Sequence, residues 1–427
     1  MGTLFLYLGL FGVFFVIGIP IVLSLAMSAI VMLIMNNMNL LVFAQRFVVS
    51  MDNFGLVAMF FFIFAGEIMN AGGMTRRIIS GVSKLVKGIP GGLAIIAIIS
   101  CALFAAINGS AIATAFAIGS ILYPAMVKQG YGKAFSAAVI AAGGVIGPII
   151  PPSIPMIVYG SITGDSIGAL FSGGVVLGIM IAIAECIVAY LISKKRGYGM
   201  QTEAIDFGDT KGLIWTLILP PLIFGCIIGG VMTATETSAF AVVYAWFVGT
   251  FIYKEFKFPD FPAIIKRAML SSGMVMGIVG AATAVAWVLT YQRVPQQVTE
   301  AMVKGINSPG VFMVVTFIIL LVIGMIMDLT PAILILAPIF MAPVVSFGVD
   351  PIYFGVFFCC VLTAGLVTPP IGTLIYMGCS TSGKSFSAVV KELAPFMVAI
   401  YIVLFLTVIF PQIITFLPKE VFHLYTF

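Results

Sequence analysis

Two polar tips interrupt long apolar stretches of the sequence, and their side chains could bind a cation. The first tip is Asn-Gly-Ser at 108–110, in the middle of the uncharged block 92–127. The second is Asp328, the only acidic residue in the apolar block 310–346. Amide, hydroxyl and carboxylate oxygens are the ligands that small hard cations prefer. An ionisable residue at membrane depth also marks a functional site by default.

Each tip has a counterpart in a proline-rich break. Gly-Pro-Ile-Ile-Pro-Pro-Ser occupies 147–153 inside a long apolar block, and Gly-Leu-Val-Thr-Pro-Pro-Ile occupies 365–371 inside another. Proline lacks an N–H and clashes with the carbonyl one turn earlier, so it breaks a helix. In a membrane the freed carbonyls must line a cavity or bind an ion. We expect two oxygen-rich sites that suit sodium, with protons as an alternative at Asp328.

The tips and breaks belong to an internal repeat. A gapless shift of 218 residues moves Ser110 onto Asp328 and the proline pair 151–152 onto the pair 369–370. The same shift matches Gly147, Ile157, Gly160 and Thr163 with Gly365, Ile375, Gly378 and Thr381. A single Gly-Pro break in a membrane helix is often a mere kink. Two breaks that each face a polar tip favour a functional pair.

The composition places these features in a membrane protein. Of 427 residues 62% are hydrophobic and 8% are charged, whereas charged residues make up about a quarter of a soluble domain. The apolar runs are continuous and helical in length, which excludes the alternation of barrel strands. We therefore predict an all-α polytopic membrane protein, surrounded by the lipid bilayer and without a nucleic-acid partner. The six cysteines show no C-x-x-C spacing, so we expect no structural metal site.

The basic residues orient the chain. We assume that the blocks 92–127 and 310–346 each enter and leave the membrane on the same side. One side then holds sixteen of the twenty basic residues: Arg76, Arg77, Lys84, Lys87, Lys128, Lys133, Lys194, Lys195, Arg196, Lys211, Lys254, Lys257, Lys266, Arg267, Lys384 and Lys391. The positive-inside rule makes that side cytoplasmic and puts the C-terminus in the periplasm. The two halves then have opposite orientations. Inverted repeats with broken helices are typical of secondary transporters.

This topology predicts five parts of the chain. Each arm of block 92–127 has about 17 residues, at the short end for a span, so length alone leaves both two full spans and a re-entrant hairpin open. The internal repeat favours re-entrant hairpins in both halves. The parts are an N-terminal scaffold region (1–52), repeat 1 (53–193, with hairpin 92–127 and broken helix 134–163), a linker with scaffold helices (194–268), repeat 2 (269–416, with hairpin 310–346 and broken helix 352–380) and a C-terminal tail (417–427).

The remaining titratable residues argue against an enzyme. A serine nucleophile at Ser110 would need a base, but the only histidine is His423 and no lysine lies at that depth. Glu67 lies near the cytoplasmic end of its helix, where it could snorkel, pair with Arg76 or Arg77, or have a functional role. Arg293 follows a span and suits either an interface anchor or a residue that binds a substrate carboxylate. A channel is disfavoured because polar residues are confined to two matched spots.

Several stretches together resemble a known family over about residues 10–410. They are G-P-I-I-P-P-S-I-P-M-I-V-Y-G from Gly147, T-G-D-S-I-G-A-L-F-S-G-G from Thr163, K-K-R-G-Y from Lys194 and M-D-L-T-P-A-I-L-I-L-A-P-I from Met327. The chain resembles the large, DctM-like membrane subunit of tripartite ATP-independent periplasmic (TRAP) transporters. W-V-L-T-Y-Q-R-V-P from Trp287 is similar to the members that carry sialic acid.

The resemblance implies an elevator-type transporter in the bacterial inner membrane, driven by sodium and without an organic cofactor. It implies two partners, a small four-helix membrane subunit and a periplasmic substrate-binding protein. It assigns two or more sodium sites to Asn108, Ser110, Gly147, Ile150 and Pro152, and to Ile326, Gly365, Thr368 and Ile371. It assigns substrate handling to Ser153, Asp328 and Arg293.

We therefore predict the large permease subunit of a sodium-coupled organic-acid importer. Sialic acid is the favoured substrate, and a C4-dicarboxylate or a keto acid is also compatible. The alternative is a stand-alone sodium/dicarboxylate or citrate symporter of the same broad architecture, which would work without a binding protein.

Overall fold

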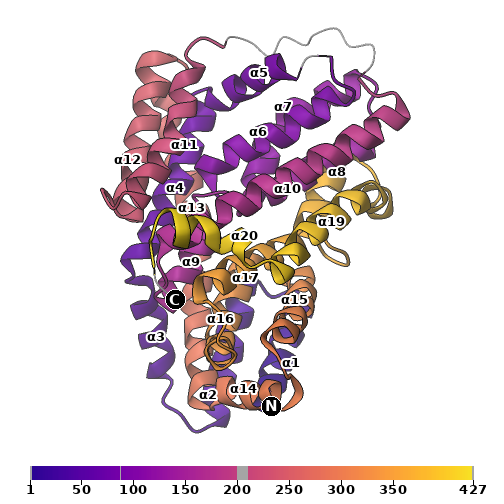
Figure 1. Ribbon diagram of the computed structural model, residues 1–427. Helices are drawn as coiled ribbons and strands as arrows, with labels where there is room; N and C mark the ends of the chain where they lie inside the picture. Colours follow the sequence, from indigo (N-terminus) through magenta and orange to yellow (C-terminus); the bar gives the residue numbers. More distant parts are fainter. Residues whose placement is uncertain (1, 87, 200–209, 426–427) are drawn as a thin grey trace.

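The computed structural model describes residues 2–86, 88–199 and 210–425, and every regular element in those ranges is a helix (Figure 1). Met1, Lys87, and parts of the predicted linker (200–209) and tail (426–427) lie outside the described residues. Eight of the described helices are long and apolar enough to cross a membrane. The prediction of an all-α polytopic protein is confirmed.

Two copies of a five-helix motif make up the centre of the chain. Corresponding helices start 217 to 219 residues apart, as at residues 111 and 329, so the shift deduced from the prolines holds along the whole motif. The first copy comprises α6 (Gly92–Asn108), α7 (Ala111–Lys128), α8 (Lys133–Val145), α9 (Ile154–Thr163) and α10 (Ile167–Arg196). The second comprises α15 (Pro309–Ile326), α16 (Leu329–Ser346), α17 (Pro351–Gly365), α18 (Thr373–Ser382) and α19 (Phe386–Ile409).

Local sequence explains where these helices stop. Gly109 ends α6 with a left-handed φ of +67°, and Ser110 then caps α7 by accepting the N–H of Ala113 at 3.5 Å. Asp328 occupies the same N-cap position before α16, with an extended backbone. None of the described residues 146–153 and 366–372 is helical, so both predicted breaks are present. The Pro151–Pro152 and Pro369–Pro370 peptide bonds are both cis.

The two hairpins enter the molecule from opposite ends. Hairpin α6–α7 lies in the upper half of Figure 1 and hairpin α15–α16 in the lower half. Their arms of 17 and 18 residues are about 26 Å long at 1.5 Å per residue, shorter than the roughly 30 Å of a hydrocarbon core. The arrangement agrees with the inverted repeat.

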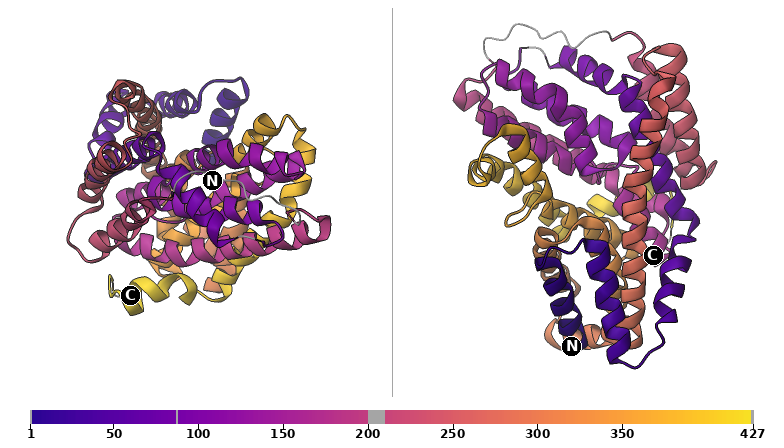
Figure 2. Two further views of the ribbon diagram at one scale, coloured as in Figure 1. Left: turned by 90° about the horizontal axis from the view of Figure 1, so that it is seen from above. Right: turned by 180° about the vertical axis from the view of Figure 1, so that it is seen from behind.

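The other helices form a frame beside the two copies. Helix α4 packs on α12 and α13, and α13 also packs on α2 and α3; α13 runs along much of the molecule (Figure 2). Helix α5 carries Arg76, Arg77 and Lys84 at the upper end of Figure 1, and α14 carries Lys304 at the lower end. The frame comprises α1 (Gly2–Val16), α2 (Ile21–Met35), α3 (Leu41–Met51), α4 (Phe54–Ala71), α5 (Met74–Leu85), α11 (Leu213–Ile228), α12 (Ala234–Phe247), α13 (Phe261–Tyr291) and α14 (Val294–Gly305), and the short α20 (Gln412–Thr415) follows α19.

Candidate functional site

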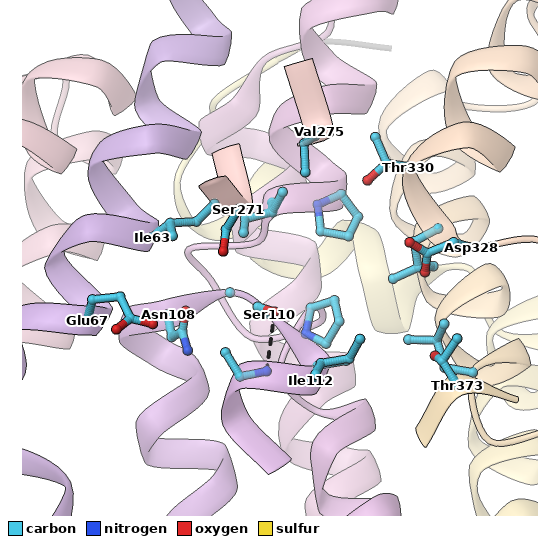
Figure 3. A pocket seen from close by; sticks show the side chains of 18 residues that line it. Ile63, Glu67, Asn108, Ser110, Ile112, Ser271, Val275, Asp328, Thr330 and Thr373 are labelled. Carbon is cyan, nitrogen blue, oxygen red and sulfur yellow. Dashed lines mark hydrogen bonds between the residues drawn. The ribbon is translucent and has the colours of Figure 1, made fainter. Parts of the chain in front are cut away.

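Both polar tips line one cavity of about 180 Å³. Figure 3 shows Glu67, Asn108 and Ser271 on one side of the cavity and Asp328, Thr330 and Thr373 on the other. The cavity therefore lies between the two copies and the frame. Its lining comes from the first copy (Asn108, Gly109, Ser110, Ala111, Ile112, Ala113, Pro148, Ile154 and Pro155), the second copy (Asp328, Leu329, Thr330, Leu366 and Thr373) and the frame (Ile63 and Glu67 of α4, Ser271 and Val275 of α13).

Four helices begin at the wall of this cavity. The first residues of α7, α9, α16 and α18 all line it, represented by Ala111, Ile154, Leu329 and Thr373. A helix N-terminus carries roughly half a positive charge and free N–H groups, so it attracts anions. The cavity can thus bind a carboxylate even though its two ionisable lining side chains, Glu67 and Asp328, are acidic.

The first tip packs directly on the first break. A Cβ atom on Gly109 would lie 2.2 Å from the carbonyl oxygen of Pro152, and one on Gly147 would lie 2.7 Å from that of Ser110. Only glycine allows both approaches. Within the described residues no backbone N–H is hydrogen-bonded to the carbonyl oxygens of Gly147, Ile150 or Pro152. Five of the predicted sodium ligands therefore lie in a tip and a break that touch each other, with three unused carbonyls.

Asn108 belongs to the same cluster and also meets the frame. Its side chain is buried and lies about 3.1 Å from the position that a Cβ on Gly66 of α4 would occupy. Figure 3 shows Asn108 beside Glu67, which is the next residue of α4. The tip of the first hairpin is therefore in contact with the frame as well as with the break.

The second break packs against the second hairpin in the same manner. A Cβ on Gly365 would lie 2.2 Å from the backbone of Gly324 in α15. The carbonyl of Gly365 accepts the N–H of Thr368 at 3.0 Å. The Thr368 hydroxyl donates to the Ala364 carbonyl at 2.7 Å and lies 2.5 Å from the Tyr401 hydroxyl.

The second site consequently offers fewer free oxygens than the first. In the described chain, the carbonyl oxygens of Ile326 and Ile371 accept no backbone N–H. The carbonyl oxygen of Gly365 and the hydroxyl of Thr368 already take part in hydrogen bonds within the protein. A cation there would depend on Ile326, Ile371 and the nearby carboxylate of Asp328.

Of the three residues predicted to handle substrate, Asp328 alone lines the cavity. Ser153 is fully buried. Its hydroxyl donates to the Pro148 carbonyl and accepts the N–H of Met156 at 3.3 Å. It therefore caps α9 and fixes the break. Arg293 is exposed at the N-cap of α14, with a φ of +55°, and is not among the residues that line the cavity.

The expected partner of Glu67 was wrong. Glu67 accepts a hydrogen bond from Arg267 Nε at 2.8 Å, whereas Arg77 pairs with Glu255 at 2.7 Å and stacks on Tyr253. Sequence reasoning also missed Ser271, Thr330 and Thr373 as lining residues. Thr330 could have been found, because it follows Asp328 by two residues in the first turn of α16. Ser271 and Thr373 carry no comparable signal in the sequence.

Comparisons with known proteins agree with the membrane architecture. Residues 8–413 match the model of a family described as the tripartite ATP-independent periplasmic transporter, DctM component. The 2,3-diketo-L-gulonate TRAP transporter large permease protein YiaN of Escherichia coli is 36% identical over 93% of this chain and 95% of its own. The sialic acid TRAP transporter large permease protein SiaM of Vibrio cholerae is 33% identical over 98% of each chain.

Another relative is longer than this chain. The isethionate TRAP transporter permease protein DctMQ of Oleidesulfovibrio alaskensis is 35% identical over 95% of this chain, which spans 65% of that protein. Two solved structures share the fold at low identity. The YdaH transporter of Alcanivorax borkumensis has a TM-score of 0.65 at 10% identity and 86% coverage of both chains. MtrF of Neisseria gonorrhoeae has a TM-score of 0.61 at 14% identity, with coverage of 84% and 83%.

Proposed function

Because the chain belongs to the DctM family of tripartite ATP-independent periplasmic transporters, we propose that it is the large permease subunit of a sodium-coupled organic-acid importer. The relatives are transporter permeases rather than enzymes. The observation that carries the proposal is the cavity at which four helix N-termini and two polar tips meet. The N-termini favour a bound anion, and the unused carbonyls at the tips favour a small cation.

The substrate class follows from the cavity and from the relatives. The relatives are named for the transport of sialic acid, C4-dicarboxylates, 2,3-diketo-L-gulonate and isethionate, which are all organic anions. Sialic acid remains the first substrate to test because of the stretch around Trp287 to Pro295. Arg293 in that stretch lies outside the cavity lining, so the cavity supports a small organic acid without favouring one member of the class.

The proposed assembly contains two further proteins. A periplasmic binding protein delivers the substrate, and a small four-helix membrane subunit joins this chain in the bacterial inner membrane. The basic ends of α5 and α10 face the cytoplasm. The two hairpins and two broken helices move together against the frame as an elevator, with sodium bound at the tips.

Reconstitution tests the proposal. Proteoliposomes containing both membrane subunits and a substrate-loaded binding protein should take up substrate when an inward sodium gradient is imposed. Uptake at the same rate without the gradient would refute sodium coupling. Uptake without any binding protein would favour the stand-alone symporter instead. A small panel of organic acids offered with the cognate binding protein identifies the substrate by competition.

A further inference from the structure

Glu67 and Arg267 form an ion pair at the edge of the cavity. Glu67 lines the cavity, and its Oε2 accepts a hydrogen bond from Arg267 Nε at 2.8 Å. The side chain of Arg267 is 55% exposed and that of Glu67 is 28% exposed. Both residues belong to the frame, on α4 and α13, and Glu67 lines the cavity together with the two tips.

Arg267 lies one helical turn beyond the lining residues of α13, at an edge of the cavity that we call its mouth. Arg267, Ser271 and Val275 are four residues apart and therefore share one face of α13. Ser271 and Val275 line the cavity. Arg267 lies one turn, about 6 Å along the axis, closer to the start of α13. Lys266 and the other basic residues near that start identify it as the cytoplasmic end.

The lining of the cavity supplies no cationic side chain for an organic anion. Among the described lining residues the ionisable ones are Glu67 and Asp328, and none is a lysine, arginine or histidine. Both acids repel an organic anion, whereas a guanidinium binds a carboxylate through two parallel N–H bonds. The bond to Glu67 uses the Nε of Arg267. Exposed ion pairs of this kind are weak, so an incoming carboxylate can replace Glu67.

Resting on the function proposed above, we infer that Arg267 binds the carboxylate of the substrate at the cytoplasmic mouth of the cavity, and that Glu67 is its displaceable counter-ion. During transport the substrate carboxylate leaves the cavity and replaces Glu67 as the hydrogen-bond partner of the Arg267 guanidinium. When the substrate departs, the ion pair between Glu67 and the Arg267 guanidinium forms again. The pair thus sets the affinity for substrate on the cytoplasmic side.

Substitution of each partner separates this role from a structural one. The measured quantity is the internal substrate concentration that half-saturates exchange in proteoliposomes holding the complete transporter. Arg267→Gln should raise that concentration several-fold, because the carboxylate loses its ligand. Glu67→Gln should lower it several-fold, because the guanidinium is free. A purely structural ion pair predicts that both substitutions act in the same direction, since each breaks the same bond.

A second ion pair of the chain provides the matched control. Arg196 bonds Glu392 at 2.7 Å with side chains 40% and 20% exposed, and neither residue lines the cavity. Arg196→Gln should leave the half-saturating concentration within about twofold of the parent value. If Arg267→Gln disturbs folding, as seen by size-exclusion and thermal unfolding, Glu67→Gln still gives the sign, and Arg267→Lys retains the charge with weaker bidentate binding.

The outcomes of the two proposals are distinguishable. A parent transporter that ignores the sodium gradient counts against the proposed function. A parent transporter that works, with Arg267→Gln and Glu67→Gln unchanged or shifted in the same direction, overturns the role of Arg267 alone. Opposite shifts with an unchanged Arg196→Gln support it.

Discussion

Gly109 offers the sharpest test of the contact between the first tip and the first break. Its φ of +67° is left-handed, and an added Cβ would lie 2.2 Å from the carbonyl oxygen of Pro152. Gly130 is a matched control, because its φ is +81° and an added Cβ would meet nothing within 4 Å. Gly109→Ala and Gly130→Ala therefore share the backbone strain and differ in the contact.

The magnitude follows from the geometry. An alanine in the left-handed region costs about 1–2 kcal/mol at either position. At Gly109 the tip must also retreat by about 1 Å, from 2.2 Å to the 3.4 Å at which ordinary contact begins, and such overpacking costs about 1–3 kcal/mol. A retreat of this size moves the side-chain oxygen of Asn108 or Ser110 too far from the carbonyl oxygens of the break for both to contact the same sodium ion. The loss of about 1.4 kcal/mol of binding energy raises the half-saturating sodium concentration about tenfold.

A sodium titration of uptake in proteoliposomes measures this effect, with thermal unfolding as the check on folding. Gly130→Ala should lower the unfolding temperature slightly and leave the sodium dependence within about twofold of the parent. Gly109→Ala should shift the sodium dependence about tenfold. Identical titrations for the two variants, at comparable levels of folded protein, would refute the assignment of the tip–break contact to a sodium site.

Three further substitutions have definite expected results. Asp328→Asn removes the only carboxylate of the second tip and should reduce sodium-driven uptake at least tenfold, while the protein stays folded. Glu185 is fully buried, and in the described part of the chain its carboxylate oxygens have no hydrogen-bond partner, so Glu185→Leu should raise the unfolding temperature. Asp350→Ala loses bonds to the Tyr353 N–H (3.0 Å) and the Tyr425 hydroxyl (2.8 Å); it should cost about 1 kcal/mol of stability without altering the sodium titration.

The breaks and tips were predictable because they depend on the backbone chemistry of single residues. A proline pair alone does not force a break, because Pro220 and Pro221 lie inside α11. The pairs at 151–152 and 369–370 each follow a glycine, at 147 and 365, and share a fixed offset, and both interrupt their helices. The fixed offset between the pairs then located the second tip from the first. The helical class followed from the continuous, helix-length apolar runs, since a chain in a membrane satisfies its backbone only within helices or a closed barrel of alternating strands.

The partners of long charged side chains were not predictable in this manner. Glu67 lies nine and ten residues from Arg76 and Arg77, yet it bonds Arg267, two hundred residues away, because α4 packs along α13. Arg77 is turned instead toward Glu255 and Tyr253. Ser271 lines the cavity for the same reason, through a helix crossing that no local pattern records. Arg293 has the chemistry of a carboxylate ligand but lies on a helix outside the cavity.

If the proposed function holds, the geometry of the cavity gives a physical reason why binding of sodium and of an organic anion would be coupled. The N-termini of α7 and α16 point their partial positive charge at the space beside the tips, while Asp328 and Glu67 place negative charge there. An organic anion that enters alone is therefore repelled by the side chains that are nearest to it. A cation held between a tip and a break offsets Asp328 and leaves the helix N-termini to bind the anion. Each bound species then lowers the free energy of binding the other, and such coupling is reciprocal by thermodynamic necessity. Under the proposed function, a transporter with Asp328→Asn should consequently lose the dependence of uptake on sodium while it keeps its affinity for the anion.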